Sequence, residues 1–173
     1  MAPKSKKSGI KAAGRTDTRD VNIGIAADDR AEIAEALSRV LADTYTLYLK
    51  THGYHWNVTG PMFNTLHTMF MAQYTELQGA VDLIAERIRA LGHFAPGTFG
   101  LYGKLAAIPE DDGVPVAMDM VANLLAGHET LARTARHALS VAEKGDDAPT
   151  ADLMTERMQI SEKTAWMLRS ILE

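Results

Sequence analysis

Four side chains able to bind a metal lie in one part of the sequence: His55, His67, Asp82 and Glu86. Imidazole nitrogens combined with carboxylate oxygens suit iron, and such sets leave positions open for an oxidant. Asp82 and Glu86 are spaced i, i+4, so they share one face of a helix. The Gly60–Pro61 pair separates His55 from His67 and predicts a short turn between two helices, which would put both histidines at the same end. These four residues are the candidate ligands of an iron centre.

The spacing of the ligands prevents them from meeting within one chain. His67 and Asp82 are 15 residues apart on one predicted helix, which corresponds to roughly 22 Å at the helical rise. Metal–ligand bonds are only about 2.0–2.2 Å long. A two-fold dimer removes the difficulty, because an antiparallel packing of this helix brings His67 of one chain opposite Asp82 of the other. We therefore predict two equivalent interface centres, each with His55 and His67 from one subunit and Asp82 and Glu86 from its partner.

Each of these residues also has an ordinary explanation when it is taken alone. A histidine on a helix is more often a surface or core-edge residue than a metal ligand. Asp82 and Glu86 are typical of a solvated face, with Glu86 close enough to Arg89 for a weak ion pair. Trp56 is more often a packing residue. The chain also lacks any Glu-x-x-His pair, the pattern of diiron sites inside a single bundle.

The elements that must position these residues are predicted to be helices. Apolar residues recur with a helical period in four long segments, and no segment has the period of a strand. Asp28 or Asp29 is the expected N-cap of the first helix, and Gly92 is expected just after the end of the second. The fold class is all-α, a ferritin-like four-helix bundle whose second and third helices are joined by a long crossover with a short helix possible at 99–108. The four helices are expected over about 28–58, 61–91, 115–144 and 150–172.

Composition limits the class of protein. The chain has 173 residues, of which 46% are hydrophobic and 23% charged, as in a single globular domain. No apolar run is long enough for a membrane span, and no secretory signal peptide is visible, so no membrane partner is expected. The absence of cysteine excludes disulfides, thiolate metal sites and cysteine nucleophiles, and it favours a cytoplasmic protein.

The charge is divided between a basic arm and an acidic body. Residues 1–20 hold six Lys and Arg against two Asp, a net charge of +4, whereas the remainder holds 12 basic and 20 acidic residues, a net charge of −8. We interpret residues 1–27 as a flexible tail before a domain spanning 28–173. The tail is expected to bind DNA without sequence specificity by releasing counterions from phosphates, although a merely solvating terminus would have the same composition. The candidate DNA-contacting residues are Lys4, Lys6, Lys7, Lys11 and Arg15.

Several short patterns at fixed spacing resemble the Dps family of mini-ferritins. The resemblance extends from about Asp29 to the end of the chain and includes Trp166-Met167-Leu168. It is densest over residues 45–92, where the matching patterns are Lys50-x-His52-x-x-His55-Trp56-x-Val58-x-Gly60, Phe63-x-x-Leu66-His67, Tyr74-x-Glu76 and Asp82-x-x-Ala85-Glu86-Arg87-Ile88.

The resemblance implies a function and an assembly. Members of the family form hollow homo-dodecamers that oxidise Fe(II), preferably with hydrogen peroxide, and store the ferric iron inside. Their ferroxidase centres lie at two-fold interfaces, which agrees with the geometry deduced above. By motif, His55, His67, Asp82 and Glu86 are the implied iron ligands, and Trp56 is implied beside them in electron transfer or radical trapping. A protein of this type would protect DNA from oxidative stress, and its expected location is the cytoplasm, in association with the nucleoid.

Two further features follow from the resemblance. The family usually has Asp or Glu four residues after the second histidine, where this chain has Met71, and a thioether is a poor ligand for iron. Acidic pores at three-fold axes admit Fe(II) in the family, and negative rings of this kind concentrate cations. The corresponding residues are expected to be Asp146, Asp147, Asp152 and Glu156, unless this segment is only a solvated acidic turn.

Two rival functions remain open. The first is a structural shell that compacts the nucleoid, with a ferroxidase centre weakened or inactivated by Met71. The second is a four-helix interaction module without a metal.

Overall fold

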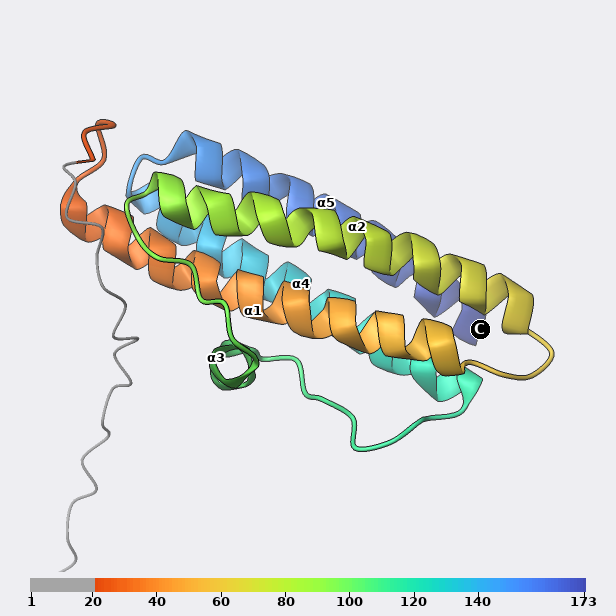
Figure 1. The fold of residues 1–173 in the computed structure, drawn as a ribbon. Coiled ribbons are helices and arrows are strands. Elements are labelled where there is room, and N and C mark those ends of the chain that lie inside the picture. The colour runs from red at the N-terminus through yellow and green to blue at the C-terminus, as the bar shows by residue number, and fades with distance from the viewer. Residues whose placement is uncertain (1–20) are drawn as a thin grey trace, which may run out of the picture.

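The structure is a computed structural model that describes residues 21–173. Four long helices form an elongated bundle, and a short fifth helix lies beside it against α1 (Figure 1). Within the described residues there is no strand. The predicted all-α four-helix bundle is confirmed, and the crossover does contain a short helix. The helices are α1 (Ala27–Asn57), α2 (Phe63–Ala90), α3 (Phe99–Leu105), α4 (Ala117–Lys144) and α5 (Ala148–Leu172).

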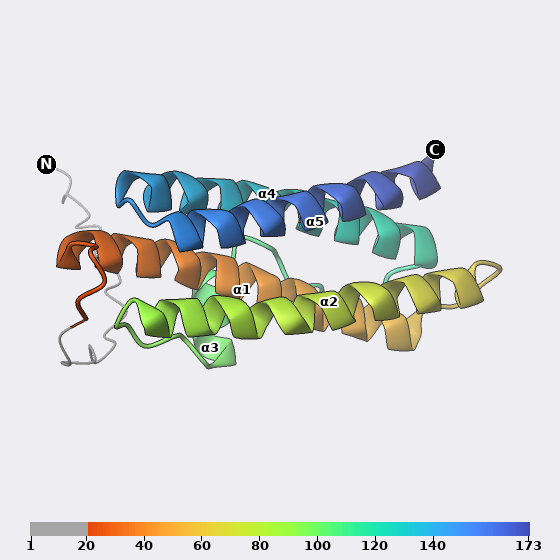
Figure 2. The ribbon, with the colours of Figure 1, turned by 90° about the horizontal axis from the view of Figure 1, so that it is seen from above.

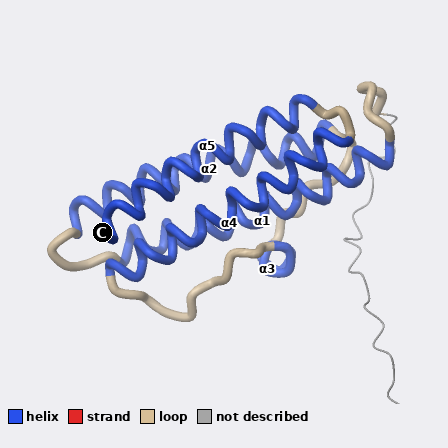
Figure 3. The backbone as a smooth tube through the Cα atoms, turned by 180° about the vertical axis from the view of Figure 1, so that it is seen from behind, coloured by secondary structure: helices blue, strands red, loops and turns tan. Residues whose placement is uncertain are grey.

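The bundle consists of two helical hairpins. The α1–α2 hairpin forms one layer and the α4–α5 hairpin the other, as Figure 2 shows. Because the crossover from α2 to α4 returns along the length of the bundle, α2 and α4 run in the same direction (Figure 3). The two layers enclose a core of apolar side chains, each worth about 1.5–3 kcal/mol when fully buried. Its largest fully buried members include Leu37, Leu41, Leu47, Leu66, Phe70, Leu77, Ile84, Ile88, Leu91, Met120 and Leu124.

The ends of the helices differ in places from the prediction. The N-cap of α1 is Ala26, which makes no side-chain cap, so the prediction of Asp28 or Asp29 as the cap is wrong. Both acidic residues lie instead in the first turn, where their negative charge interacts favourably with the positive end of the helix dipole. The prediction for Gly92 is confirmed, since its φ of +89° is the left-handed conformation that favours glycine. A side chain there would also clash with Val21, whose Cγ2 would lie 2.8 Å from the added Cβ.

The crossover is fixed to α1 by a buried carboxylate. Asp43 is fully buried, and its Oδ1 accepts hydrogen bonds from the main-chain nitrogens of Ala107, at 2.6 Å, and Ile108, at 3.1 Å. Its Oδ2 accepts a 2.7 Å bond from the hydroxyl of Thr134 on α4. One side chain thus joins α1, the crossover and α4, which holds α3 in place beside α1. This role of Asp43 was not predicted from the sequence.

A second attachment lies nearer to the end of α1. The Lys50 ammonium is 3.2 Å from Oδ1 of Asp111, and the Tyr54 hydroxyl donates a hydrogen bond to the same carboxylate. Burial and this carboxylate raise the pKa of Tyr54 above its usual value. The segment after α3 is therefore held at two points against the helix that carries His55.

Candidate metal centre

His55 and His67 are brought together by the turn between α1 and α2. His55 lies in the last turn of α1 and His67 in the second turn of α2. Their rings stack with centroids 3.7 Å apart and planes inclined by 21°. Nδ1 of His55 lies 2.8 Å from the main-chain oxygen of His67, and Nδ1 of His67 lies 2.8 Å from the main-chain oxygen of His55. The structure thus confirms that the two histidines lie side by side.

The reciprocal bonds indicate which nitrogen of each ring carries a proton. A carbonyl oxygen can only accept a hydrogen bond, so each Nδ1 must carry the proton. In the neutral ring, Nε2 is then the nitrogen with a free lone pair, which is the form that binds a metal. Outer hydrogen bonds of this kind orient metal-binding histidines. His55 and His67 therefore form half of a metal site that is already oriented.

The turn sets the relative level of the two helices. Gly60 has a φ of +101°, a conformation that favours glycine, and its carbonyl accepts a 3.0 Å hydrogen bond from the nitrogen of Phe63. Val58, two residues before Gly60, is buried and is the C-cap of α1. Pro61 lies in this turn, and α2 begins at Phe63, two residues later than predicted. A connection this short leaves little freedom in the register between His55 and His67.

Aromatic rings surround the pair of histidines. The ring of Phe63 stacks on His67 with centroids 5.1 Å apart, and Tyr74 meets His55 edge-on at 5.2 Å. Trp56 is 61% exposed and lies with its ring centroid 4.1 Å from that of His52. The indole therefore lies exposed at the surface in contact with His52, whose ring centroid is 6.3 Å from that of His55. Its role beside the centre stays a prediction.

Asp82 and Glu86 do not join the histidines within the chain. Both are exposed, about two turns and one turn before the end of α2, and α2 is one uninterrupted helix from Phe63 to Ala90. Within residues 21–173, no three His, Cys, Asp or Glu side chains come close enough to share a metal. The described chain thus presents two separate groups of candidate ligands, one of imidazoles and one of carboxylates.

The exposed face of α2 lies between these two groups. Met71, one turn after His67, is 44% exposed, and Leu83 is 51% exposed. Between them are Ala72, Thr75 and Gly79, which are also exposed and have small side chains. A Cβ added to Gly79 would meet no atom within 4 Å. This face is therefore smooth and partly apolar, which allows the close approach of another helix.

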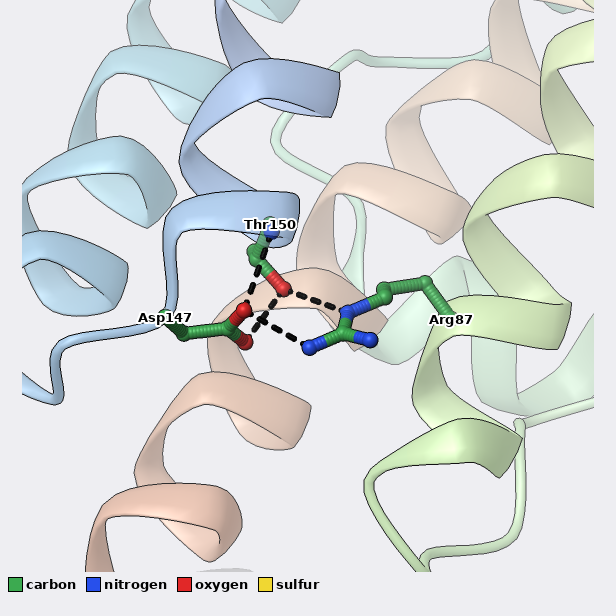
Figure 4. Close-up of polar contacts among 3 residues, drawn as sticks. All are labelled: Arg87, Asp147 and Thr150. Carbon is green, nitrogen blue, oxygen red and sulfur yellow. Dashed lines mark hydrogen bonds and ion pairs between the residues drawn. The ribbon is translucent and has the colours of Figure 1, made fainter. Parts of the chain in front are cut away.

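The acidic turn before α5 is more ordered than the sequence suggests. Asp147 is fully buried and caps α5, because its Oδ1 accepts a 3.0 Å bond from the nitrogen of Thr150. The Arg87 guanidinium donates at 2.6 Å to the same oxygen and at 2.8 Å to the Thr150 hydroxyl (Figure 4). Burial alone would raise the pKa of Asp147, but the bonds from Arg87 and Thr150 and the charge of Arg87 hold it below its usual value. The signal in the sequence was the Asp-x-x-Thr spacing, which is common at helix starts.

This finding changes the role of one residue predicted for iron entry. Asp146, Asp152 and Glu156 are exposed, whereas the carboxylate of Asp147 is bound within the chain and has no surface to offer a solvent channel. The acidic pore remains a prediction that rests on the three exposed residues. The candidate DNA-contacting residues lie outside the described part of the chain; they are Lys4, Lys6, Lys7, Lys11 and Arg15.

Comparison with known proteins identifies the family. A family model described as a ferritin-like domain matches residues 34–173. The chain is 37% identical to the DNA protection during starvation protein of Brevibacillus brevis, over 82% of this chain and 95% of that protein. The crystal structure of the Dps protein of Vibrio cholerae superposes with a TM-score of 0.84 at 33% identity, covering 88% of this chain and 97% of that one. This chain belongs to the Dps family of mini-ferritins.

Further solved structures and relatives extend the similarity. DpsC of Streptomyces coelicolor superposes with a TM-score of 0.88 at 27% identity and covers 96% of both chains. A low temperature-induced protein of Nostoc sp. is 41% identical over 155 residues, which is 88% of this chain and 87% of that protein. The Vibrio cholerae protein is described as a member of a broad superfamily of ferritin-like diiron-carboxylate proteins. No helix within residues 21–173 is long and apolar enough to cross a membrane.

Proposed function

We propose that this chain is a ferroxidase and iron-storage subunit that oxidises Fe(II) with hydrogen peroxide at centres shared between two subunits. The observation that carries the proposal is the reciprocal pair of His55 and His67, whose Nε2 atoms are free to bind Fe(II). The balanced reaction consumes two Fe(II), one hydrogen peroxide and two protons and yields two Fe(III) and two water molecules. Because iron enters as the substrate, the protein's task is to bind it, orient it and stabilise the additional positive charge.

The carboxylates of a second subunit would complete each centre. If α2 packs antiparallel to its symmetry mate with His67 opposite Asp82 of the partner subunit, Met71 lies opposite Gln78 of the partner subunit and the axis passes close to Thr75. The small exposed residues at 72, 75 and 79 would then lie at the middle of the contact. This arrangement covers Met71 and Leu83 and gives Fe(III) the anionic oxygen ligands that it prefers.

Assembly beyond the dimer supplies storage. Dps-type dodecamers enclose a cavity, and exposed Asp146, Asp152 and Glu156 near the start of α5 would attract Fe(II) to an entrance. Removing Fe(II) and peroxide together prevents the formation of hydroxyl radicals and thereby protects DNA, as the name of the Brevibacillus brevis relative describes for that protein. Twelve basic tails on one shell would add weak phosphate contacts by avidity, so we propose non-specific DNA binding as well.

The rival function is a shell that compacts DNA without oxidising iron. Met71 favours it, because a thioether occupies the position one turn after His67 where the family usually has a carboxylate. The two functions make different predictions for a protein loaded with Fe(II) under anaerobic conditions. Addition of peroxide should produce ferric absorbance within the mixing time of a stopped-flow instrument if the chain is a ferroxidase, and only the slow uncatalysed reaction if it is not.

The matched variants for this experiment are His67→Ala and His137→Ala. His67 is proposed as a ligand, whereas His137 is an exposed histidine of α4. His67→Ala should lower the rate at least about a hundredfold, more than the loss of an outer partner would, and His137→Ala should not change it. Size-exclusion chromatography with light scattering establishes that both variants assemble. Equal rates for the two variants would exclude the histidine pair from the reaction.

Deleting residues 1–20 tests the DNA-binding part separately. The truncated shell should no longer retard DNA in a gel, and it should oxidise Fe(II) at the rate of the full chain. Retardation that persists after the deletion would assign DNA binding to another surface.

A further inference from the structure

We propose that four tyrosines conduct a single oxidising equivalent away from the histidine pair, along α1 to α3. The proposal rests on the function proposed above, because Fe(II) and peroxide supply the oxidant. It concerns Tyr74, Tyr48, Tyr45 and Tyr102, none of which is a candidate ligand. Together with His55 they form an unbroken series of ring contacts, which we call the tyrosine chain.

The tyrosine chain begins at the candidate centre. Tyr74 of α2 meets His55 edge-on with ring centroids 5.2 Å apart. Tyr48 of α1 lies 6.3 Å from Tyr74, and Tyr45 lies 5.8 Å from Tyr48, both in edge-on contacts. Tyr102 of α3 stacks on Tyr45 at 4.8 Å with an angle of 23° between the planes. Every step is therefore within direct ring contact, the range in which aromatic rings interact.

Trp56 is connected to the same chain through His52. The His52 ring lies between the two, with its centroid 4.1 Å from that of Trp56 and 4.2 Å from that of Tyr74. An oxidising equivalent captured by the indole can thus reach Tyr74 through one intervening ring. The chain has an entry from the metal side at His55 and a second entry from the surface at Trp56.

The distribution of tyrosines supports a path rather than general aromatic packing. The protein has five tyrosines, and four of them belong to the chain. The fifth, Tyr54, is next to His55 in sequence but points to the other side of α1, where it contacts Phe70 and bonds to Asp111. Tyrosine is thus concentrated on the face of α1 that leads from the histidines to α3.

The far end of the chain is well placed to hold a radical. Tyr102 is buried, and its hydroxyl donates a 2.8 Å hydrogen bond to the carbonyl of Pro96. Burial and Tyr45 raise its pKa, so the phenol stays protonated until it is oxidised. α3 lies beside the middle of α1, away from the turn that holds His55 (Figure 1). A radical on Tyr102 would therefore be separated from the iron ligands and from bulk peroxide.

A single oxidising equivalent arises when a centre holds only one Fe(II). One Fe(II), one peroxide and one proton then give Fe(III), water and a hydroxyl radical. The radical abstracts the phenolic hydrogen of Tyr74, which yields water and a tyrosyl radical. Electron transfer between the rings in contact then moves the radical toward Tyr102. At each step the newly oxidised phenol releases a proton and the reduced tyrosyl takes one up. A second Fe(II), with a proton, restores the last tyrosine and becomes Fe(III). The overall reaction is the same as that of two Fe(II) with one peroxide. A weakened second iron position at Met71 would make this route frequent.

The test uses Tyr74→Phe, which keeps the ring but removes the phenolic hydrogen. The assembled protein is loaded anaerobically with one Fe(II) per centre, mixed with peroxide and frozen for electron paramagnetic resonance. We expect a tyrosyl radical in the wild-type protein, a severalfold smaller signal in Tyr74→Phe, and a corresponding increase in hydroxyl radical caught by a spin trap. Tyr54→Phe, the matched control outside the chain, should give the wild-type signal. A packing role for Tyr74 would change thermal stability but not the radical yield.

The position of the radical is tested with Tyr102→Phe. A nitroso spin trap followed by peptide mass spectrometry should label Tyr102 in the wild-type protein and shift the label to Tyr45 or Tyr48 in this variant. Normal Fe(II) oxidation with equal radical yields in wild type and Tyr74→Phe would overturn the tyrosine chain and leave the ferroxidase function intact. No oxidation of Fe(II) in the wild-type protein would overturn the ferroxidase function, and the tyrosine chain with it.

Discussion

The imidazoles of His55 and His67 are each held by the main chain of the other residue, with both Nδ1–O distances at 2.8 Å. This reciprocal arrangement needs only one chain, and it orients both Nε2 atoms before any iron arrives. The carboxylates of Asp82 and Glu86 lie farther along the same helix and are exposed. A subunit thus carries a formed imidazole half and a separate carboxylate half, which makes oxidation depend on assembly.

Mixed dimers provide a direct test of the divided centre. A chain carrying His67→Ala and a chain carrying Asp82→Ala should each form inactive homodimers, because every centre lacks one ligand. In the mixed dimer, one centre has lost both ligands and the other is intact. Unfolding and reassembling the two variants together should therefore restore activity, with about half of the wild-type rate per mixed dimer.

The control for this experiment is the same mixture of His55→Ala and His67→Ala chains. Both substitutions affect the imidazole half, so no mixed dimer gains an intact centre and activity should stay absent. Restored oxidation in the control mixture, or none in the first mixture, would show that the ligands are not divided between subunits in this way.

Asp147→Asn should destabilise the fold. The substitution removes the charge that pairs with Arg87 at 2.6 Å in a site where the carboxylate is fully buried. Removing one partner of a buried ion pair costs about 3–5 kcal/mol of folding stability. Because the side chain of Arg87 is 17% exposed, we expect a loss at the lower end of this range. Urea denaturation at neutral pH measures the change. The control is Glu162→Gln, which removes an exposed partner of Arg136 and should change stability by less than about 1 kcal/mol.

The same carboxylate should make stability sensitive to acid. The pKa of Asp147 is lower in the folded protein than its ordinary value, so the unfolded chain binds the proton more readily. Its contribution is present above the ordinary pKa of an aspartate and is lost as the pH falls through the folded value. The stability difference between wild type and Asp147→Asn should shrink below about pH 4. A difference that stays constant down to pH 3 would show that the carboxylate's charge does not contribute.

Protonation of His128 should cause a second loss of stability, at a higher pH than that of Asp147. It is buried in α4, neither ring nitrogen has a hydrogen-bond partner, and burial lowers its pKa from 6.5 to about 4. Because the unfolded chain binds a proton below pH 6.5 and the folded chain does not, stability falls as the pH drops from about 6.5 to about 4. A shift of this size corresponds to a loss on the order of 3 kcal/mol. His128→Leu should flatten the stability profile in this window, whereas the exposed His137→Leu should retain the wild-type slope.

Features of this fold that depend on local sequence were predictable, whereas contacts between distant segments were not. Apolar periodicity predicted the four long helices because each buries one continuous stripe, and the glycine after α2 was predictable because its conformation is set locally. The cap at Asp147 had a local signal in the Asp-x-x-Thr spacing, but its burial and its ion pair did not, because they depend on Arg87, 60 residues away in sequence. Asp43 is a similar case, with partners 64 and 91 residues away. The pairing of His55 with His67 was predictable because a short turn joins their helices, but their reciprocal main-chain bonds were not.

Met71→Glu tests whether the departure from the family pattern limits iron binding. Met71 lies four residues after His67 on α2, so a carboxylate there would share the face of the histidine and could reach the same metal. The substitution should strengthen Fe(II) binding about tenfold, which is about 1.4 kcal/mol, and it should lower the tyrosyl radical yield because both iron positions then fill together. Calorimetric titration with Fe(II) under anaerobic conditions measures the first effect. Met71→Leu, which removes the sulfur without adding a charge, is the matched control and should bind Fe(II) as the wild type does. Equal affinities of Met71→Glu and Met71→Leu would mean that the second iron position is completed by other groups and that the thioether does not weaken it.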